Sequence, residues 1–162
     1  MAWTIEEPTV ADADELGRVH VAIWRQAYAG LMPPDYLDGL DADEFATSWR
    51  ERLDDPFPGT TRLVVRDDEG IVGFSTAGPP RSDDAPADLE LYAINLLPRA
   101  HGTGVADDLL EATIGDRAAY LWVIEGNERA ISYYRKRGFA DDGGRTVDQE
   151  SGANEIRMVR PA

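Results

Sequence analysis

The chain has 162 residues, 43% of them hydrophobic, and carries a formal net charge of −15. This length suits one domain with its own core, which we expect to span residues 1–162. The negative charge argues against a nucleic acid as partner, because binding a polyanion requires a basic surface. No apolar run approaches the roughly 18 residues of a membrane span, and the N-terminus lacks a signal-peptide pattern. We therefore predict a cytoplasmic protein that binds neither nucleic acid nor membrane.

The chain contains no cysteine, and its two histidines are His20 and His101. This composition excludes disulfides, thiolate nucleophiles and cysteine-based zinc sites. We predict that no metal is bound, and that His20, which lies beside an apolar helical stripe, has a structural role.

The hydrophobic pattern predicts helices in the first third of the chain and strands after it. Asp12 stands three residues before Glu15, a capping-box arrangement at the start of an apolar helical stripe. From Thr60 the apolar period becomes that of strands, and residues 68–70 supply turn chemistry for a hairpin. The elements expected here are a strand over 3–7, a helix from 12 to near 30, a short helical piece within 32–40, a helix over 43–53, and strands over 62–67, 71–77 and 89–97.

The sequence pattern of the second half of the chain predicts one strand, turn, helix, strand crossover followed by a hairpin. Gly138 stands where a helix C-terminus favours a residue tolerant of the left-handed conformation. The expected elements are a helix to about residue 117, a strand over 120–124, a helix over 127–137, and a hairpin of 139–146 with 156–159. The fold class is α+β: helices first, then a largely antiparallel sheet with one strand, turn, helix, strand crossover inserted.

The stretch from residue 89 to 114 contains the strongest functional signal. A strand is stopped by Pro98, and a glycine-rich turn leads into an amphipathic helix that begins at Gly104. Backbone N–H groups from Gly102 to Ala106 and the helix dipole would converge on an anion. Small residues are needed there because the backbone itself must approach the phosphates. The stretch therefore predicts a site for a phosphate-bearing ligand.

Two other phosphate-binding motifs fit the turn poorly. A P-loop requires a lysine after its last glycine, and none follows Gly104. A dinucleotide fingerprint requires a third glycine where Asp107 stands, although Glu125 is spaced like its ribose ligand. The antiparallel meander before the turn also disagrees with a doubly wound parallel sheet. A dehydrogenase is therefore a distant alternative.

The turn resembles the acetyl-CoA-binding motif of the GNAT superfamily of N-acetyltransferases, which reads Gln or Arg, two residues, Gly, one residue, and Gly or Ala. A register that starts at Arg99 also fits, but the distance to the Leu109-Leu110 pair favours one that starts at His101, where the family has Gln or Arg. The residues that match the motif, and are implied to bind the cofactor, are His101, Gly102, Thr103, Gly104, Val105 and Ala106.

Similarity to the family extends over about residues 90–139. The resemblance implies a GNAT-like fold, with a mostly antiparallel sheet of about seven strands, a splayed central strand pair and about four helices. It also implies an acetyltransferase that moves an acetyl group from acetyl-CoA to a primary amine by direct attack in a ternary complex. A homodimer is possible by the same resemblance. The alternative is a non-catalytic coenzyme A-binding regulatory or interaction module.

Direct attack requires an amine that has lost its proton, and an alkyl ammonium has a pKa of roughly 10.4. The resemblance places a base, acting directly or through water, at Glu90, which should share a strand face with Tyr92. An ordinary strand carboxylate with an ion-pair partner is an equally good interpretation of Glu90.

The resemblance also implies roles for four further residues. The backbone N–H near Leu96 would stabilise the oxyanion where the central strand bulges and splays, and free main-chain groups of Leu96 and Leu97 would pair with the pantetheine arm. Tyr134 would donate a proton to the coenzyme sulfur, with core packing as the alternative. Asn127 would bond the pantetheine amides, with a helix cap as the alternative.

The acceptor side carries the weakest signals. The first two helices typically cover this side in the superfamily, and the candidate substrate-binding residues are Trp24, Tyr28, Tyr36 and Tyr92. Core packing explains each of them equally well. The acidic residues 35, 38, 41 and 43 would suit a cationic amine, such as a polyamine or an N-terminal amine. Which amine is the acceptor does not follow from the motif.

Overall fold

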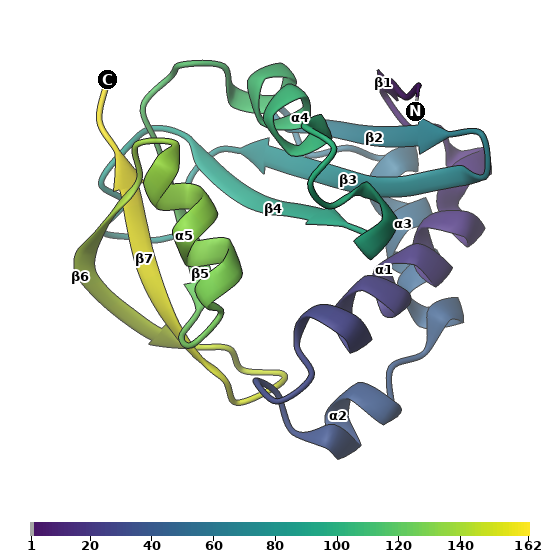
Figure 1. Cartoon of the computed structure of the whole chain (residues 1–162), viewed down its shortest axis with the longest axis horizontal. Coiled ribbons are helices and arrows are strands. Elements are labelled where there is room, and N and C mark those ends of the chain that lie inside the picture. Colours follow the sequence, from purple (N-terminus) through teal and green to yellow (C-terminus); the bar gives the residue numbers. More distant parts are fainter. Residues whose placement is uncertain (1) are drawn as a thin grey trace.

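The computed structural model describes residues 2–162, which form a seven-stranded sheet with helices on both faces (Figure 1). The elements in chain order are β1 (Thr4–Glu6), a 3-10 turn (Val10–Asp12), α1 (Ala13–Ala27), α2 (Pro34–Asp38), α3 (Ala42–Asp54), β2 (Thr61–Asp67), β3 (Gly70–Gly78), β4 (Glu90–Leu96), a 3-10 turn (Pro98–Ala100), α4 (Val105–Ile114), β5 (Ala119–Ile124), α5 (Glu128–Lys136), β6 (Ala140–Val147) and β7 (Asn154–Arg160).

The strands lie in the order β1-β2-β3-β4-β5-β7-β6. All neighbours pair antiparallel except β4 and β5, which run parallel. The predicted α+β class with a mostly antiparallel sheet is therefore confirmed. The last hairpin inserts its second strand, β7, between β5 and β6, because β7 has the more apolar pattern and is the better interior strand.

The start of α1 differs from the sequence prediction. The capping carboxylate is Asp12, which accepts a hydrogen bond from the backbone N–H of Thr9 at 2.8 Å, three residues earlier than expected. Glu15 instead accepts from the backbone N–H of Ile71 at 2.8 Å. Glu15 thus ties the first helix to the β2–β3 turn, a long-range contact that local spacing could not reveal.

Helices on opposite faces bury different residues of the same strands. On one face α1 and α3 pack against Val64, Ile71 and Phe74, while on the other α4 packs against Val65 and Val72. Val64 and Val65 point to opposite faces because of the pleat. Ile71 and Phe74 share a face although they are three residues apart, because the register shift between β2 and β3 makes Val72 the extra residue of a bulge. Helices α4 and α5 together cover β5 and β7.

His20 lies within the aromatic cluster between α1, α3 and β3. Its ring stacks on Phe45 with a centroid distance of 4.5 Å, and Trp49 Nε1 donates a hydrogen bond to its Nδ1 at 3.1 Å. Burial, with the charge of Arg52 adding to it, lowers the pKa of His20 to about 4. His20 is therefore neutral and structural, as its position on α1 indicated.

This histidine should make stability depend on pH. The pKa of His20 lies near 4 when folded and near 6.5 when unfolded, so the unfolded chain binds the extra proton between these values and stability falls as pH drops through them. We expect the unfolding free energy of the wild type to lose about 2 kcal/mol more between pH 7 and pH 4.5 than that of His20→Phe. Urea titrations at the two pH values measure this difference. Parallel losses in both proteins would contradict it.

Candidate active site

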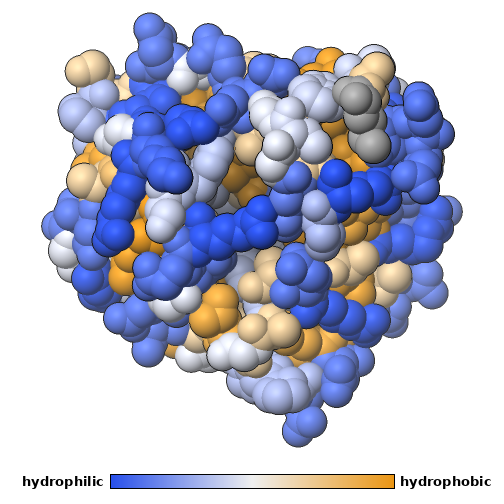
Figure 2. Space-filling model, viewed as in Figure 1, coloured by the Kyte–Doolittle hydropathy of each residue, from blue (hydrophilic) through white to orange (hydrophobic). Residues whose placement is uncertain are grey.

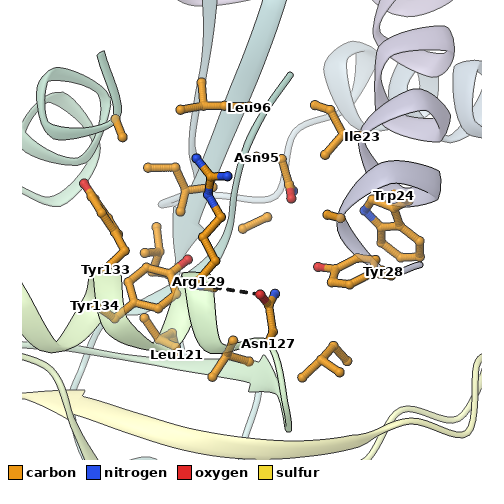
Figure 3. Close-up of a pocket in the computed structure, with 18 of the residues that line it drawn as sticks. Ile23, Trp24, Tyr28, Asn95, Leu96, Leu121, Asn127, Arg129, Tyr133 and Tyr134 are labelled. Carbon is orange, nitrogen blue, oxygen red and sulfur yellow. Dashed lines mark hydrogen bonds between the residues drawn. The ribbon is translucent and has the colours of Figure 1, made fainter. Parts of the chain in front are cut away.

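A cavity of about 570 Å³ lies between β4 and β5, where the two parallel strands diverge. Its walls come from α1, β4, the glycine turn, β5 and α5, with residues of the β6–β7 hairpin at one end. Figure 3 shows Trp24 of α1 and Tyr28, which follows that helix, on one side of it, and Asn127, Arg129 and Tyr134 on the other. The cavity thus joins the predicted phosphate site to the predicted acceptor side.

The register of β4 and β5 shows where the two strands diverge. The one registered pair between β4 and β5 is Glu90 with Tyr120, and beyond it the strands separate. The register between β3 and β4 shifts at Tyr92, which is the extra residue of a bulge. The predicted splay is therefore present, but the bulge lies four residues before Leu96, where it was expected.

The pairing of β4 with β3 decides which main-chain groups face the cavity. The backbone N–H of Leu97 donates to the carbonyl of Val72 at 2.7 Å, so these two residues form a hydrogen-bonded pair. Hydrogen-bonded and non-bonded pairs alternate along an antiparallel ladder. Leu96, which is opposite Gly73, therefore directs its N–H away from β3, toward the side that β5 has left.

The main chain of Leu97 is already engaged within the protein. Its N–H is bonded to Val72, its carbonyl accepts from the N–H of Ala100 at 2.9 Å, and its side chain packs with the core of α1 and α3. Only the second lone pair of its carbonyl oxygen could pair with a ligand. These contacts favour Leu96 over Leu97 as the partner of the pantetheine arm, and the role of Leu97 stays a prediction.

The glycine turn presents free N–H groups to the cavity. Gly102 and Gly104 adopt φ values of 74° and 89°, which favour glycine, and nothing lies within 4 Å of where a Cβ would stand. Within residues 2–162 the backbone N–H groups without a hydrogen-bond partner include those of Gly102, Thr103, Gly104 and Ala106. These groups lie at the N-terminus of α4, which favours an anion.

Two motif residues contribute to the shape of the turn and do not line the cavity. The Thr103 hydroxyl donates to the carbonyl of Ala100 at 2.6 Å and closes the turn. The Val105 side chain is buried with Leu109 under the sheet and anchors the first turn of α4.

His101 holds the strand end and carries no charge. Its Nε2 lies 3.1 Å from the carbonyl oxygen of Leu96, which can only accept, so this nitrogen is the donor. Burial, with the nearby charge of Arg129 adding to it, lowers the pKa of His101. A charge on His101 is thus disfavoured, whereas the family's Arg at this position would bring one.

The cations of the site come from α5, which the motif did not include. Arg129 lines the cavity and makes no ion pair or side-chain hydrogen bond with any described residue. Arg137 also lines it, but its guanidinium is held by Asp107 with bonds of 2.6 and 2.7 Å. Arg137 and the Tyr133 hydroxyl together hold down the pKa of Asp107, although burial acts against them. Arg129 is the free cation beside the turn.

Tyr134 and Asn127 both line the cavity. Burial, and after it the electrostatic effect of Tyr28, raises the pKa of Tyr134, so its hydroxyl keeps its proton. This hydroxyl has no hydrogen-bond partner among residues 2–162, whereas that of Tyr133 donates to Asp107 at 2.9 Å. Asn127 caps α5 by accepting from the N–H of Ala130 at 3.4 Å, which leaves its amide NH₂ for other partners.

Glu90 does not line the cavity. Its side chain is 1% exposed and accepts hydrogen bonds from Tyr120 Oη at 2.9 Å, from the backbone N–H of Arg81 at 2.9 Å and from the Arg81 guanidinium at 2.8 Å. A carboxylate with these partners is poorly placed to take a proton from a substrate. The structure therefore favours the ion-paired interpretation of Glu90 over the catalytic base.

The aromatic candidates divide between the cavity and the core. Trp24, Tyr28 and Tyr92 line the cavity, whereas Tyr36 packs beside it and directs its hydroxyl to Glu150 at 3.5 Å. The exposed acids 35, 38, 41 and 43 do not line it either. Two carboxylates that the sequence did not single out, Asp148 and Glu155, do. Asp148 opens the polar loop between β6 and β7 and Glu155 follows it, and this loop carries no motif, so no spacing signal could have found them.

The comparisons with known proteins agree with this fold and site. The model of the acetyltransferase (GNAT) family matches residues 22–139. The uncharacterized N-acetyltransferase YuaI of Bacillus subtilis is 35% identical over 148 residues, covering 86% of this chain and 83% of its own length. An N-acetyltransferase of Mycobacterium tuberculosis, also uncharacterized, is 35% identical over 161 residues, covering 93% and 98%. The arrangement is thus that of an acyltransferase.

Solved structures show the same fold at low identity. The PaiA N-acetyltransferase from Thermoplasma acidophilum, in complex with coenzyme A, matches with a TM-score of 0.77 at 20% identity, covering 100% of both chains. The NAA60 protein of Arabidopsis thaliana, in complex with a bisubstrate analogue, has a TM-score of 0.64 at 16% identity, covering 98% of this chain and 97% of its own. The chain belongs to the GNAT family and is a GNAT N-acetyltransferase.

The close approach of β3 to β4 should be essential for the site. A Cβ on Gly73 would lie 2.4 Å from Leu96 Cδ2 and 2.5 Å from the carbonyl oxygen of Asn95. We expect Gly73→Ala to lower the unfolding free energy by about 2 kcal/mol, because backbone must shift. Gly39→Ala is the control, since its Cβ would have no contact closer than 3.2 Å. Chemical denaturation compares the two, and equal stabilities would contradict the steric argument.

Proposed function

We propose that residues 1–162 form one N-acetyltransferase domain that transfers an acetyl group from acetyl-CoA to a primary amine, by direct attack in a ternary complex. The observation that supports this most is the single cavity that joins the free N–H groups of the glycine turn to the Tyr134 hydroxyl. The mostly antiparallel sheet argues against a dinucleotide dehydrogenase, which binds its cofactor on a mostly parallel, doubly wound sheet. Cytoplasmic location and a homodimer stay predictions from the sequence.

The residues present fit coenzyme A. The N–H groups of Gly102, Gly104 and Ala106 would bind its pyrophosphate, and the open space in front of both glycines leaves room for the phosphates. Arg129 would add the charge that His101 does not supply. Asn127 and the second lone pair of the Leu96 carbonyl oxygen, which already accepts from His101, would bind the pantetheine amides. The complex of PaiA with coenzyme A is a precedent within the same fold.

The bound donor would supply a thioester carbonyl for attack by the amine. The N–H of Leu96 would stabilise the oxyanion as it develops. Tyr134 would give its proton to the departing sulfur, a role for which a protonated hydroxyl without internal partners is suited. Tyr133 is the weaker candidate, because its hydroxyl is bound to Asp107.

Coenzyme A affinity should depend on the conformation of Gly104. We expect Gly104→Ala to weaken acetyl-CoA binding about tenfold or more, because a Cβ at φ 89° strains the turn and enters the space for the anion. Gly143→Ala is a matched control, because Gly143 also has φ 90° and open space around it but lies on β6. Isothermal calorimetry measures both. Loss of affinity in both variants, or in neither, would argue against the proposed site, and a wild type that does not bind acetyl-CoA would overturn the function.

Catalysis should depend on the Tyr134 hydroxyl. We expect Tyr134→Phe to lower kcat about 100-fold with acetyl-CoA affinity unchanged, whereas Tyr133→Phe should lower it far less. Release of free thiol from acetyl-CoA with a panel of amines, amino acids, polyamines and peptides measures this. Turnover with any amine excludes the non-catalytic coenzyme A-binding module. Unchanged kcat in Tyr134→Phe would remove the proton donor and leave the family membership intact.

A further inference from the structure

The end of the cavity remote from the glycine turn is acidic. Asp148 and Glu155 line it, and both belong to the hairpin of β6 and β7. The connection between these strands lies beside the α1–α2 connection, at the opposite end of the molecule from α4 (Figure 1). Tyr28 is close to both carboxylates: burial, followed by their charges, raises the pKa of Tyr28 to about 12.

The two carboxylates differ in their hydrogen-bond and salt-bridge partners. Asp148 accepts hydrogen bonds from the backbone N–H and the hydroxyl of Ser151, and so holds its own loop. Glu155 is half-buried and forms neither a salt bridge nor a side-chain hydrogen bond with residues 2–162. The guanidinium whose charge acts on Glu155, that of Arg81, is bound to Glu90 at 2.8 Å and lies 4.1 Å above the Tyr92 ring.

A half-buried carboxylate without a partner is costly unless a cation binds to it. Burial, and next the charge of Asp148, raises the pKa of Glu155. Four groups around the site act on its charge: Asp148 of the loop, Arg81 before β4, Glu90 of β4 and Tyr28 at the end of α1. Of these four groups only Arg81 is cationic, and it already forms a salt bridge with Glu90. Glu155 is therefore open to a positive ligand.

Two aromatic side chains form the wall beside these carboxylates. Trp24 and Tyr28 both line the cavity, and Figure 3 shows them side by side at the end of α1. The indole nitrogen of Trp24 is buried and has no hydrogen-bond partner among the described residues. Less than 1 Å² of this nitrogen is accessible, so the aromatic rings, and not the indole N–H, would contact a ligand.

We infer that Glu155 binds the ammonium group of a cationic primary amine and takes its proton, with Asp148 favouring acceptors that carry further positive charge. This inference rests on the proposed function and names the base and acceptor class for it. It replaces Glu90, whose carboxylate is enclosed by donors, and the exposed acids near α2, which lie outside the cavity.

The proton and bond changes balance as follows. Glu155 takes one proton from the ammonium and releases it to solvent through the open cavity. The neutral amine forms the C–N bond while the C–S bond breaks. The sulfur takes a proton from Tyr134, and the proton left on the nitrogen restores the Tyr134 hydroxyl. No metal, oxidant or reductant is needed.

The first test compares Glu155→Gln with Asp35→Asn, which removes the same charge from the exposed surface of α2. At pH 7 we expect kcat of Glu155→Gln with 1,4-diaminobutane to fall about 100-fold and that of Asp35→Asn to stay unchanged. Acetyl-CoA affinity should be unchanged in both, which shows that each is folded. Unchanged kcat in Glu155→Gln would overturn the inference. If Glu155→Gln does not fold, Glu155→Ala replaces it, because it also removes the carboxylate, and kcat equal to the wild type would overturn the inference in the same way.

The pH profile separates a base from a structural residue. Wild-type kcat/KM should be nearly flat from pH 7 to 9, because a carboxylate base binds the amine as its ammonium form, which predominates in this range. The Glu155→Gln variant must use amine that is already neutral in solution, so its kcat/KM should rise about tenfold per pH unit toward the amine pKa. Parallel profiles would overturn the role as base.

The acceptor class is tested by changing only the remote group of the amine. We expect kcat/KM to fall at least tenfold from 1,4-diaminobutane to 4-aminobutanol, and further to 4-aminobutanoate, and Asp148→Asn to reduce this range. Calorimetry without acetyl-CoA should show diaminobutane binding that Glu155→Gln weakens about tenfold and Asp35→Asn does not. No preference for the diamine would overturn the acceptor class. Absence of turnover with every amine would instead contradict the proposed function. The calorimetry would still show whether Glu155 binds the diamine.

Discussion

The structure depends on one buried contact, the hydrogen bond between Glu90 and Tyr120 at the only point where β4 and β5 pair. The Glu90 carboxylate accepts from the Tyr120 hydroxyl and from Arg81, all at the apex of the angle between the strands. Removing one partner from a buried charged network is costly, so this contact fixes where the strands meet and therefore where they part. The cavity exists because pairing ends there.

The separation of β5 from β4 beyond this contact determines which main-chain groups face the cavity. Because β5 leaves β4, the outward N–H groups of β4 lack a strand partner, and that of Leu96 faces the cavity. Because β5 continues into α5, its helix brings Arg129 and Tyr134 to the opposite wall. A parallel pair that continued for its full length would have filled the cleft with ladder bonds and left no site.

Much of the fold could be predicted from local pattern, since apolar period and glycine turns determine where elements begin and end. The hairpin, the crossover and the turn at Gly102 and Gly104 are of this kind. Long-range contacts could not be predicted: Glu15 bonds to Ile71, and β7 inserts between β5 and β6. Glu90 shows the limit for the site, because a strand pattern indicates which face a carboxylate lies on and not what covers that face.

The charged residues of the cleft also divide into one that lies near a recognisable motif and two that do not. The basic residue beside the glycine turn, Arg129, lies on a helix close to a recognisable motif, whereas the acids at the other end, Asp148 and Glu155, come from a hairpin without one. A chain with net charge −15 has many exposed carboxylates, so composition alone cannot single out the two that line this end of the cavity. The cleft is therefore polar along its length, basic where an anionic donor would bind and acidic where the acceptor would enter. This polarity would orient an anion and a cation toward each other, with Tyr134 between them.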